Sequence, residues 1–160
     1  TELREQLKKY SWDQSQITDS DILIVFAVPT NFDRKFIEKH TENLQKIRWI
    51  TDEKKASVTD FIVSSTIENW KSIWLNNFED WLACQAYITL RNLITWLAVL
   101  WIDACPIEWF SNEKYDELLN LKEKNLSSKV ILAIWKRWAE DKYQNEKKVR
   151  FPKEELFIDL

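Results

Sequence analysis

Residues 83–108, ACQAYITLRNLITWLAVLWIDACPIE, contain the pattern that decides the fold. They overlap a stretch, residues 77–101, whose second half is apolar on nearly every side of a helical projection. A helix that is apolar all round lies in a core or at a subunit interface. Pro106 then ends the helical periodicity, because proline cannot continue a helix and favours extended backbone before it. The stretch therefore predicts a core helix followed by a short extended segment over residues 103–110.

Two short apolar runs lie on either side of this helix in the sequence. Residues 21–28 read DILIVFAV and are closed by Pro29, and residues 129–135 read KVILAIW. Continuous runs rich in β-branched residues are typical of strands that are covered on both faces. The first run is predicted to be a central strand, and the second a further buried strand.

Amphipathic helices are predicted between these elements. Residues 31–47 carry apolar side chains at helical spacing, residues 52–75 form a second helix or helix pair, and Ser111 can cap a short helix over residues 112–121. In the second of these, the expected inward positions are Val58, Phe61, Ile62, Ser65, Ile67 and Trp70. Strands interleaved with helices indicate an α+β or three-layer α/β domain.

The two ends of the chain are expected to lie outside this core. Residues 1–19 are polar and contain a weak helical start, so we expect them at the surface. The charged residues after 135 are expected to be irregular and to end in an extended segment over residues 155–160.

Composition excludes several classes of function. The 160 residues are 45% hydrophobic and 31% charged with a net charge of −3, which fits one globular domain over residues 1–160. Lys and Arg alternate with Asp and Glu, so no basic stretch indicates nucleic-acid binding. Cys84, Cys105 and His40 are too few soft ligands for a metal centre, and both thiols are expected to be buried. The longest apolar stretch, residues 93–102, is shorter than the ~20 residues of a membrane-spanning helix, so we expect a cytoplasmic protein that does not bind membranes.

Glycine and tryptophan occur in unusual amounts. Glycine is absent, although about eleven would be expected from its usual share, and tryptophan occurs ten times. Without glycine there is no phosphate loop, dinucleotide-binding turn or nucleophile elbow, because each needs positive φ or a close backbone approach. Methionine is absent as well, which indicates a trimmed, engineered or otherwise altered sequence.

Four stretches in the second half of the chain resemble the FMN-dependent nitroreductase family in order, spacing and identity. They are residues 83–93 (ACQAYITLRNL), 102–108 (IDACPIE), 121–124 (LKEK) and 148–152 (KVRFP). Residues 16–27 also look like the family strand that precedes a variable helical region, whereas residues 31–77 match only in character. The resemblance covers most of the chain.

This resemblance implies both a fold and a chemistry. The family has an α+β fold with three layers, α/β/α, built on a central, mostly antiparallel sheet and a long core helix. It forms an intertwined homodimer that holds FMN at the interface. NAD(P)H gives a hydride to the flavin, and a nitroaromatic, quinone or similar acceptor then takes the electrons. Because the flavin carries the redox chemistry, no catalytic side chain is expected.

The resemblance also implies two groups of cofactor-binding residues. Pro106, Ile107 and Glu108 match the family stretch whose backbone lies against the isoalloxazine ring near N5, and Trp109 follows directly. Lys148 and Arg150 match the basic pair that reaches the FMN phosphate, where two cations suit a dianion. Judged by local pattern alone, Glu108 could be a solvated carboxylate and the basic residues an exposed charged tail.

The sequence departs from the family pattern in two ways. The family's opening part, with an Arg-rich phosphate-binding motif and a Ser/Asn/Gln-Pro segment that contacts the flavin, has no counterpart before Thr1. Tryptophan stands where the family has glycine or a small residue, at Trp96, Trp101, Trp109 and Trp135, with Trp138 as a further case. An indole at position 109 would fill the place of the flavin ring or displace the backbone. Those at positions 96 and 101 would overpack the core.

The sequence therefore predicts an FMN-dependent NAD(P)H oxidoreductase of nitroreductase type that forms a homodimer in the cytoplasm. The alternative is a non-catalytic or engineered derivative that has lost the flavin pocket to Trp109 and acts as a scaffold or interaction module. The aromatic content also suggests a stacking surface for single-stranded nucleic acid, but the acidic balance disfavours it. A helical binding protein unrelated to flavin would leave the ordered motifs unexplained.

Overall fold

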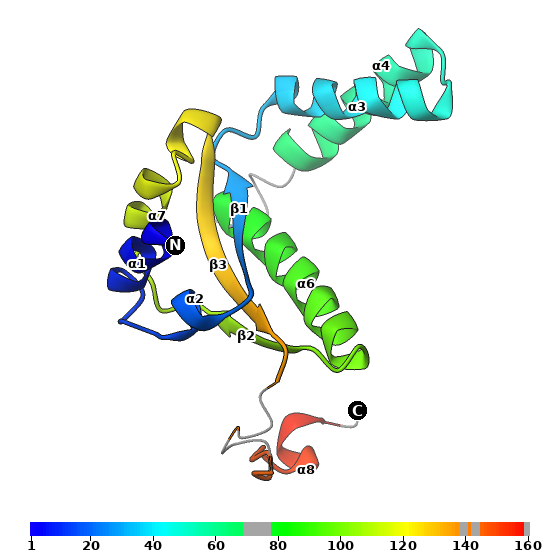
Figure 1. Ribbon diagram of the computed structural model, residues 1–160. Helices are drawn as coiled ribbons and strands as arrows, with labels where there is room; N and C mark the ends of the chain where they lie inside the picture. Colours follow the sequence, from blue (N-terminus) through cyan, green and yellow to red (C-terminus); the bar gives the residue numbers. More distant parts are fainter. Residues whose placement is uncertain (69–77, 138–140, 142–144, 159–160) are drawn as a thin grey trace.

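A three-stranded antiparallel sheet forms the centre of the fold in the computed structural model, which describes residues 1–68, 78–137, 141 and 145–158 (Figure 1). Its strands are β1 (Ile22–Pro29), β2 (Asp103–Ile107) and β3 (Leu126–Trp135), in the order β1-β3-β2. All three lie where strands or extended backbone were predicted. The prediction that residues 21–28 form the central strand is wrong for this sheet, because β3 lies between the other two strands.

The burial of the strands explains this order. Val130, Ile131, Leu132 and Ala133 in β3 have no exposed surface, so consecutive side chains are covered on both faces of the sheet. Ile22 in β1 is 54% exposed, as expected of an edge position. The apolar run of β3 therefore marks a central strand, whereas the similar run of β1 forms an edge strand.

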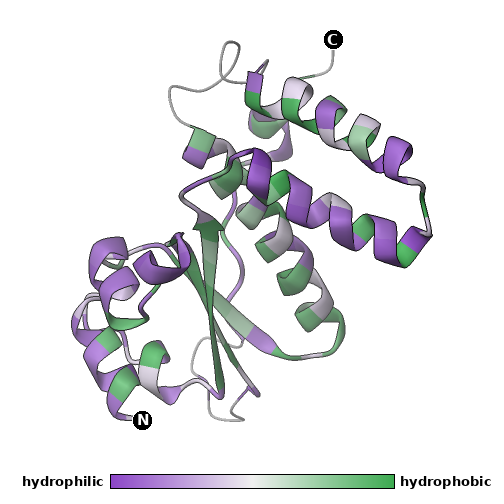
Figure 2. Ribbon diagram, turned by 90° about the horizontal axis from the view of Figure 1, so that it is seen from above, coloured by the Kyte–Doolittle hydropathy of each residue, from purple (hydrophilic) through white to green (hydrophobic). Residues whose placement is uncertain are grey.

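Helices cover the two faces of the sheet and produce the predicted α/β/α layers (Figure 1). On one face, α6 (Phe78–Val99) packs Leu90 and Leu97 against Val130, Leu132 and Ile134. The strands and much of α6 are hydrophobic in Figure 2. The predicted helix over residues 77–101 is thus confirmed as α6, but only one of its faces lies in the core of a single chain, since Ile88, Trp96 and Val99 are more than half exposed.

The other face is covered by α1 (Glu2–Lys9), α2 (Gln16–Asp19) and α7 (Asn112–Leu118). Their buried side chains Leu7, Ile17 and Tyr115 form one cluster with Ile107, Ile131 and Ala133. The prediction that residues 1–19 lie at the surface is wrong, since Leu7 and Ile17 are 3% and 0% exposed. The reason is that α7 is short, so the sheet face needs the two N-terminal helices to exclude water.

Helices α3 (Arg34–Arg48) and α4 (Asp52–Ile62), followed by the π-helical segment η1 (Val63–Glu68), project away from the sheet (Figure 1). They confirm the two predicted amphipathic helices, and a 2.8 Å hydrogen bond between the Thr41 and Thr59 hydroxyls joins α3 to α4. Phe61 was predicted to face inward but is 70% exposed, and Thr59 is buried instead. Trp70 lies outside the described residues.

Smaller elements complete the chain. Ser111 caps α7 as predicted, accepting a hydrogen bond from the Lys114 N–H. A 3-10 turn, η2 (Lys122–Lys124), precedes β3, and α8 (Lys153–Leu156) forms where the extended end was predicted to begin. Within the described residues, no helix combines the length and the apolarity that crossing a membrane requires.

Candidate functional site

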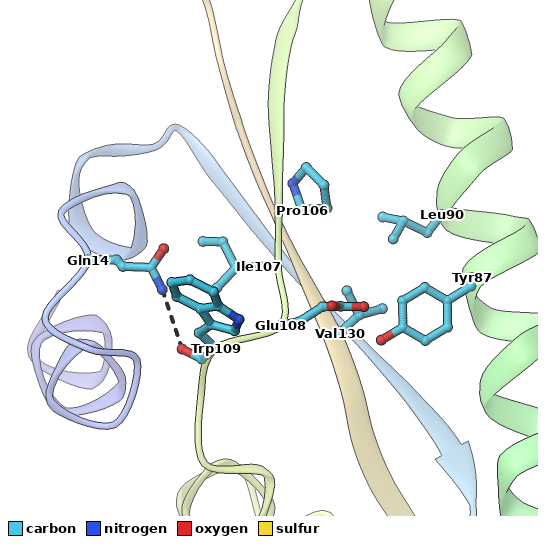
Figure 3. Close-up of a pocket in the computed structure, with 8 residues that line it drawn as sticks. All are labelled: Gln14, Tyr87, Leu90, Pro106, Ile107, Glu108, Trp109 and Val130. Atoms are coloured by element: carbon cyan, nitrogen blue, oxygen red, sulfur yellow. Dashed lines mark hydrogen bonds between the residues drawn. The ribbon is translucent and has the colours of Figure 1, made fainter. Parts of the chain in front are cut away.

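A cavity of about 420 Å³ opens beside the end of β2, between α6 and the loop that follows α1 (Figure 3). Its walls on α6, β2 and β3 are largely apolar, and its polar side chains are Gln14, Tyr87 and Glu108. Its lining residues are Gln14, Tyr87, Leu90, Pro106, Ile107, Glu108, Trp109 and Val130. The four residues predicted to lie against a flavin ring, at positions 106–109, are therefore brought together in one cavity wall.

The edge of β2 gives this wall its unpaired backbone. β2 pairs only with β3 among the described residues, from Asp103 opposite Trp135 to Ile107 opposite Ile131. Pro106 has no N–H, so it is tolerated only where the nitrogen faces away from the neighbouring strand. β2 ends at Ile107, so the N–H of Glu108 lies beyond the last residue pair that β2 forms with β3. The site thus presents a backbone donor that the sheet does not use.

Trp109 forms part of the cavity wall rather than its filling. Its indole is 64% exposed and packs on Trp12, with ring centroids 4.7 Å apart. Gln14 fixes the backbone here, because its side-chain amide donates to the Trp109 carbonyl at 3.3 Å and to the Ser11 carbonyl at 3.1 Å (Figure 3). The cavity remains open next to this indole, which does not support the alternative of a pocket plugged by Trp109.

Tyr87 and Glu108 approach each other across the cavity from α6 and the end of β2 (Figure 3). Burial, followed by a hydrogen bond to Glu108 and its negative charge, raises the pKa of Tyr87 to about 12. The Tyr87 hydroxyl therefore stays neutral and donates to the Glu108 carboxylate. This contact ties the helix to the segment that was predicted to face the ring.

The sequence analysis missed Gln14 and Tyr87. Gln14 lies in a polar loop that was predicted to be surface, and more than ninety residues separate it from the Trp109 carbonyl that it contacts. Tyr87 lies within the matching stretch at residues 83–93, but an apolar helix gives no sign of which aromatic residue faces a cavity. Its position one turn before the buried Leu90 was the available signal.

Lys148 and Arg150, the predicted phosphate-binding pair, do not reach this cavity in a single chain. Both are exposed and belong to the segment beyond β3, where the Arg150 guanidinium donates to the Val149 carbonyl at 2.8 Å. Among the described residues, no Lys or Arg side chain lines the cavity. The two predicted parts of the cofactor site thus remain separate within one copy of the chain.

The other tryptophans noted in the sequence do not overpack the core of a single chain. Trp96 and Trp101 are 67% and 90% exposed, so the predicted overpacking by these two indoles is wrong here. Trp135 is partly buried and packs against the core cluster of α1 and α7. Trp138 lies outside the described residues.

A second cavity of similar volume lies at the far end of α6, but Arg137, the one cationic side chain among its described lining residues, is already engaged. Arg137 forms two hydrogen bonds of 2.6 Å with the Asp103 carboxylate, and these raise its pKa. None of the predicted site residues lines this cavity. The cavity at the end of β2 is therefore the better candidate.

The cysteines are placed differently from the prediction. Cys84 is exposed rather than buried, while Cys105 in β2 is partly buried, and its burial raises the pKa of the thiol. No group of three or more His, Cys, Asp or Glu side chains in the described part of the chain is arranged to hold a metal ion.

Comparisons with known proteins agree with this arrangement. No protein-family model matches the sequence. A Staphylococcus epidermidis protein named as an NAD(P)H nitroreductase is 32% identical over an aligned length of 159, and the alignment covers 91% of this chain and 70% of that protein. An oxygen-insensitive NAD(P)H nitroreductase of Salmonella typhimurium is 27% identical over 94% of this chain and 69% of its own length.

Solved structures show the same fold. The crystal structure of a Staphylococcus epidermidis protein described as an NAD(P)H:FMN oxidoreductase superposes with a TM-score of 0.77 at 18% identity, covering 99% of this chain and 71% of that one. A Bacillus subtilis nitroreductase gives the same TM-score at 16% identity and covers 73% of that chain. With this fold, the wall at residues 106–109 and relatives of such identity and coverage, the chain belongs to the NAD(P)H nitroreductase family.

Proposed function

We propose that this chain is an FMN-dependent oxidoreductase that transfers hydride from NAD(P)H, through the flavin, to a nitroaromatic, quinone or similar acceptor. The names of its relatives support the nicotinamide and nitro chemistry, and the name of one structural neighbour supports FMN. The observation that carries the proposal is the free backbone edge at Pro106–Glu108 within an apolar cavity.

The cavity suits the ring of FMN. Its volume of about 420 Å³ lies within the ~300–1,000 Å³ of small-molecule sites. Leu90, Ile107 and Val130 supply an apolar surface for an aromatic ring, and the N–H of Glu108 supplies a hydrogen-bond donor at its edge. Bound FMN would supply the acceptance and release of hydride, while these residues orient the ring and exclude water.

The phosphate requires cations that this cavity lacks, and a second copy of the chain would supply them. Lys148 and Arg150 are exposed on the segment beyond β3, where they are accessible to a partner. Three apolar side chains on α6, those of Ile88, Trp96 and Val99, are more than half exposed and would be covered in a dimer. A homodimer with FMN at its interface accounts for both features.

FMN binding tests the ring site directly. The change Glu108→Pro removes the proposed N–H donor, while Glu108→Ala removes the carboxylate and keeps the N–H. Titration followed by flavin fluorescence should show the Kd for FMN rising about tenfold in the first variant and less than about threefold in the second, since ~1.4 kcal/mol corresponds to one good hydrogen bond. Far-UV circular dichroism must show both variants folded.

Two outcomes would count against the proposal in different ways. If the unchanged chain does not bind FMN at all, the cofactor assignment fails. If FMN binds but Glu108→Pro has no effect, the backbone edge of β2 is not the ring site. Steady-state oxidation of NADH and NADPH with a nitroaromatic or a quinone then identifies the preferred pair of substrates.

Subunit complementation tests the divided phosphate site. One variant carries Glu108→Pro, and the other carries Lys148→Ala with Arg150→Ala. If the basic pair serves the partner's cavity, a mixed dimer contains one intact site, and FMN binding should recover to about half of the unchanged protein's capacity. If both parts belong to the same chain, every site in the mixed dimer is defective and no binding returns. The predictions of a single domain and of a cytoplasmic location stay predictions.

A further inference from the structure

Three tryptophans occupy left-handed backbone conformations. Trp12, Trp49 and Trp101 have φ values of 51°, 54° and 58°. This region is unfavourable for any residue with a Cβ, and a bulky residue there is an outlier. The other positive-φ residues in the described part of the chain are Asp13, Asn120 and Asn125, which belong to the types that tolerate the region.

The position of Trp101 shows which residue the backbone requires. After α6, the Ile102 N–H donates to the Leu97 carbonyl at 2.9 Å, and the Trp101 N–H donates to the Ala98 carbonyl at 3.2 Å. These two bonds define a Schellman motif with Trp101 at its left-handed position, where glycine is the usual residue.

The other helix ends give an internal comparison. Trp49 ends α3 with a single bond from its N–H to the Gln45 carbonyl at 2.8 Å, which is the simpler left-handed cap. Asn120 and Asn125 occupy the equivalent left-handed positions after α7 and η2. Asparagine is the ordinary second choice at such positions and tryptophan is not.

Burial does not offset the backbone cost of these three indoles. Trp12, Trp49 and Trp101 are 72%, 91% and 90% exposed, although tryptophan is normally among the most buried residues on average. Burial therefore gives no reason for choosing tryptophan at any of the three positions.

The composition of the whole chain shows the same discrepancy, tryptophan in place of glycine. No residue is glycine, although about eleven would be expected, and ten are tryptophan. We propose that the polypeptide made from this gene carries glycine at all ten tryptophan positions, because one codon that corresponds to tryptophan here is decoded as glycine in its own cell. A single codon assignment accounts for the missing glycines, the surplus of tryptophans and the left-handed caps together.

Among the residues that line the cavity, the proposal changes one, Trp109. Trp109 supplies part of the cavity wall, and its ring packs on the left-handed Trp12. Glycine at both positions would remove this indole pair and widen the approach to the Glu108 backbone. The proposal about these positions holds whether or not the chain binds FMN.

Mass spectrometry of the protein purified from cells that carry its own gene tests the proposal. Peptide sequencing should find glycine at each of the ten positions, and every peptide that contains one of them should be lighter than its printed sequence by the difference between tryptophan and glycine. Tryptophan found at position 12, 49 or 101 would overturn the proposal, as would tryptophan at any of the other seven.

Discussion

Replacing Trp101 with glycine should stabilise the chain, whereas the same replacement at Trp96 should destabilise it. Trp101 follows the end of α6 and Trp96 lies in its last turn, and both are largely exposed, at 90% and 67%, so neither replacement removes much buried apolar surface. The two positions differ in their backbone. Trp96 has helical geometry inside α6, while Trp101 has a φ of 58° in the turn that follows.

The expected magnitudes follow from this difference. A residue with a Cβ destabilises the folded chain by ~1–2 kcal/mol in the left-handed region. Glycine avoids this cost, but its greater freedom in the unfolded chain reduces the gain in stability by ~0.5–1 kcal/mol. Trp101→Gly should therefore raise the free energy of unfolding by ~0.5–1 kcal/mol, which is a rise in Tm of about 2–4 °C at most for a chain of this size. Glycine inside a helix is less favourable than tryptophan by ~0.5 kcal/mol, so Trp96→Gly should lower the free energy of unfolding.

Urea unfolding followed by far-UV circular dichroism measures both changes without depending on tryptophan fluorescence. The dependence of the unfolding free energy on urea should stay unchanged, so the midpoints can be compared directly. Asn120→Gly is a useful control, because asparagine already tolerates its left-handed position and the change should be small. If Trp101→Gly and Trp96→Gly shifted stability in the same direction, the loss of an exposed indole would explain the data and the backbone argument would fail.

Three further changes test other parts of the structure. Asp116→Ala should lower the free energy of unfolding by ~2–3 kcal/mol, because the buried Asp116 carboxylate accepts a hydrogen bond from the Ser128 N–H at 2.7 Å and the variant leaves that N–H unpaired. Asp116→Asn should lose less stability, and urea unfolding measures both changes. Tyr87→Phe should weaken FMN binding by about threefold, the effect of a hydrogen bond worth ~0.7 kcal/mol. The factor should be the same from neutral pH to about pH 10, because a pKa of about 12 keeps the Tyr87 hydroxyl protonated; a pH-dependent ratio of the two Kd values in that range would contradict this. Glu79→Gln should reduce the loss of stability in acid, because the hydrogen bond with Lys129 lowers the pKa of Glu79 below 4.5. The ionised Glu79 therefore stabilises the fold above that pH, and this stabilisation is lost as the pH falls through the lowered pKa. Parallel curves of stability against pH for the variant and the unchanged chain would refute this expectation.

The strands and the core helix could be predicted because hydrophobic periodicity reports burial directly. The run at residues 129–135 and one face of the apolar helix became core, and Ser111 signalled the start of α7. The N-terminal segment was misjudged for the opposite reason. Short helices bury few side chains, so Leu7 and Ile17 stand among polar residues and produce no clear period.

Left-handed positions were harder to predict than helices. The sign of φ at Trp12 and Trp49 is set by where the chain must reverse after a helix, and turn prediction relies on Gly, Asn or Asp to show this. Tryptophan gives no such signal. Only Trp101 among these three positions could be singled out in advance, because the resemblance to the family extends through the segment that follows it. The cavity residues were also predicted only in part. Residues 106–109 were predicted from a motif, whereas Gln14 and Tyr87 come close to them only in the folded chain.

Pro106 explains how an exposed strand edge can remain available to a ligand. β2 is an edge strand among the described residues, and unpaired N–H groups on such an edge favour pairing with another chain. Proline at position 106 removes one outward donor and leaves the N–H of Glu108, two residues later, as an isolated group. Pro106→Ala would restore the row of outward donors, so light scattering during refolding should show more association than for the unchanged chain. Equal scattering would mean that some other feature protects this edge, and the proline would then matter only for the shape of the cavity wall.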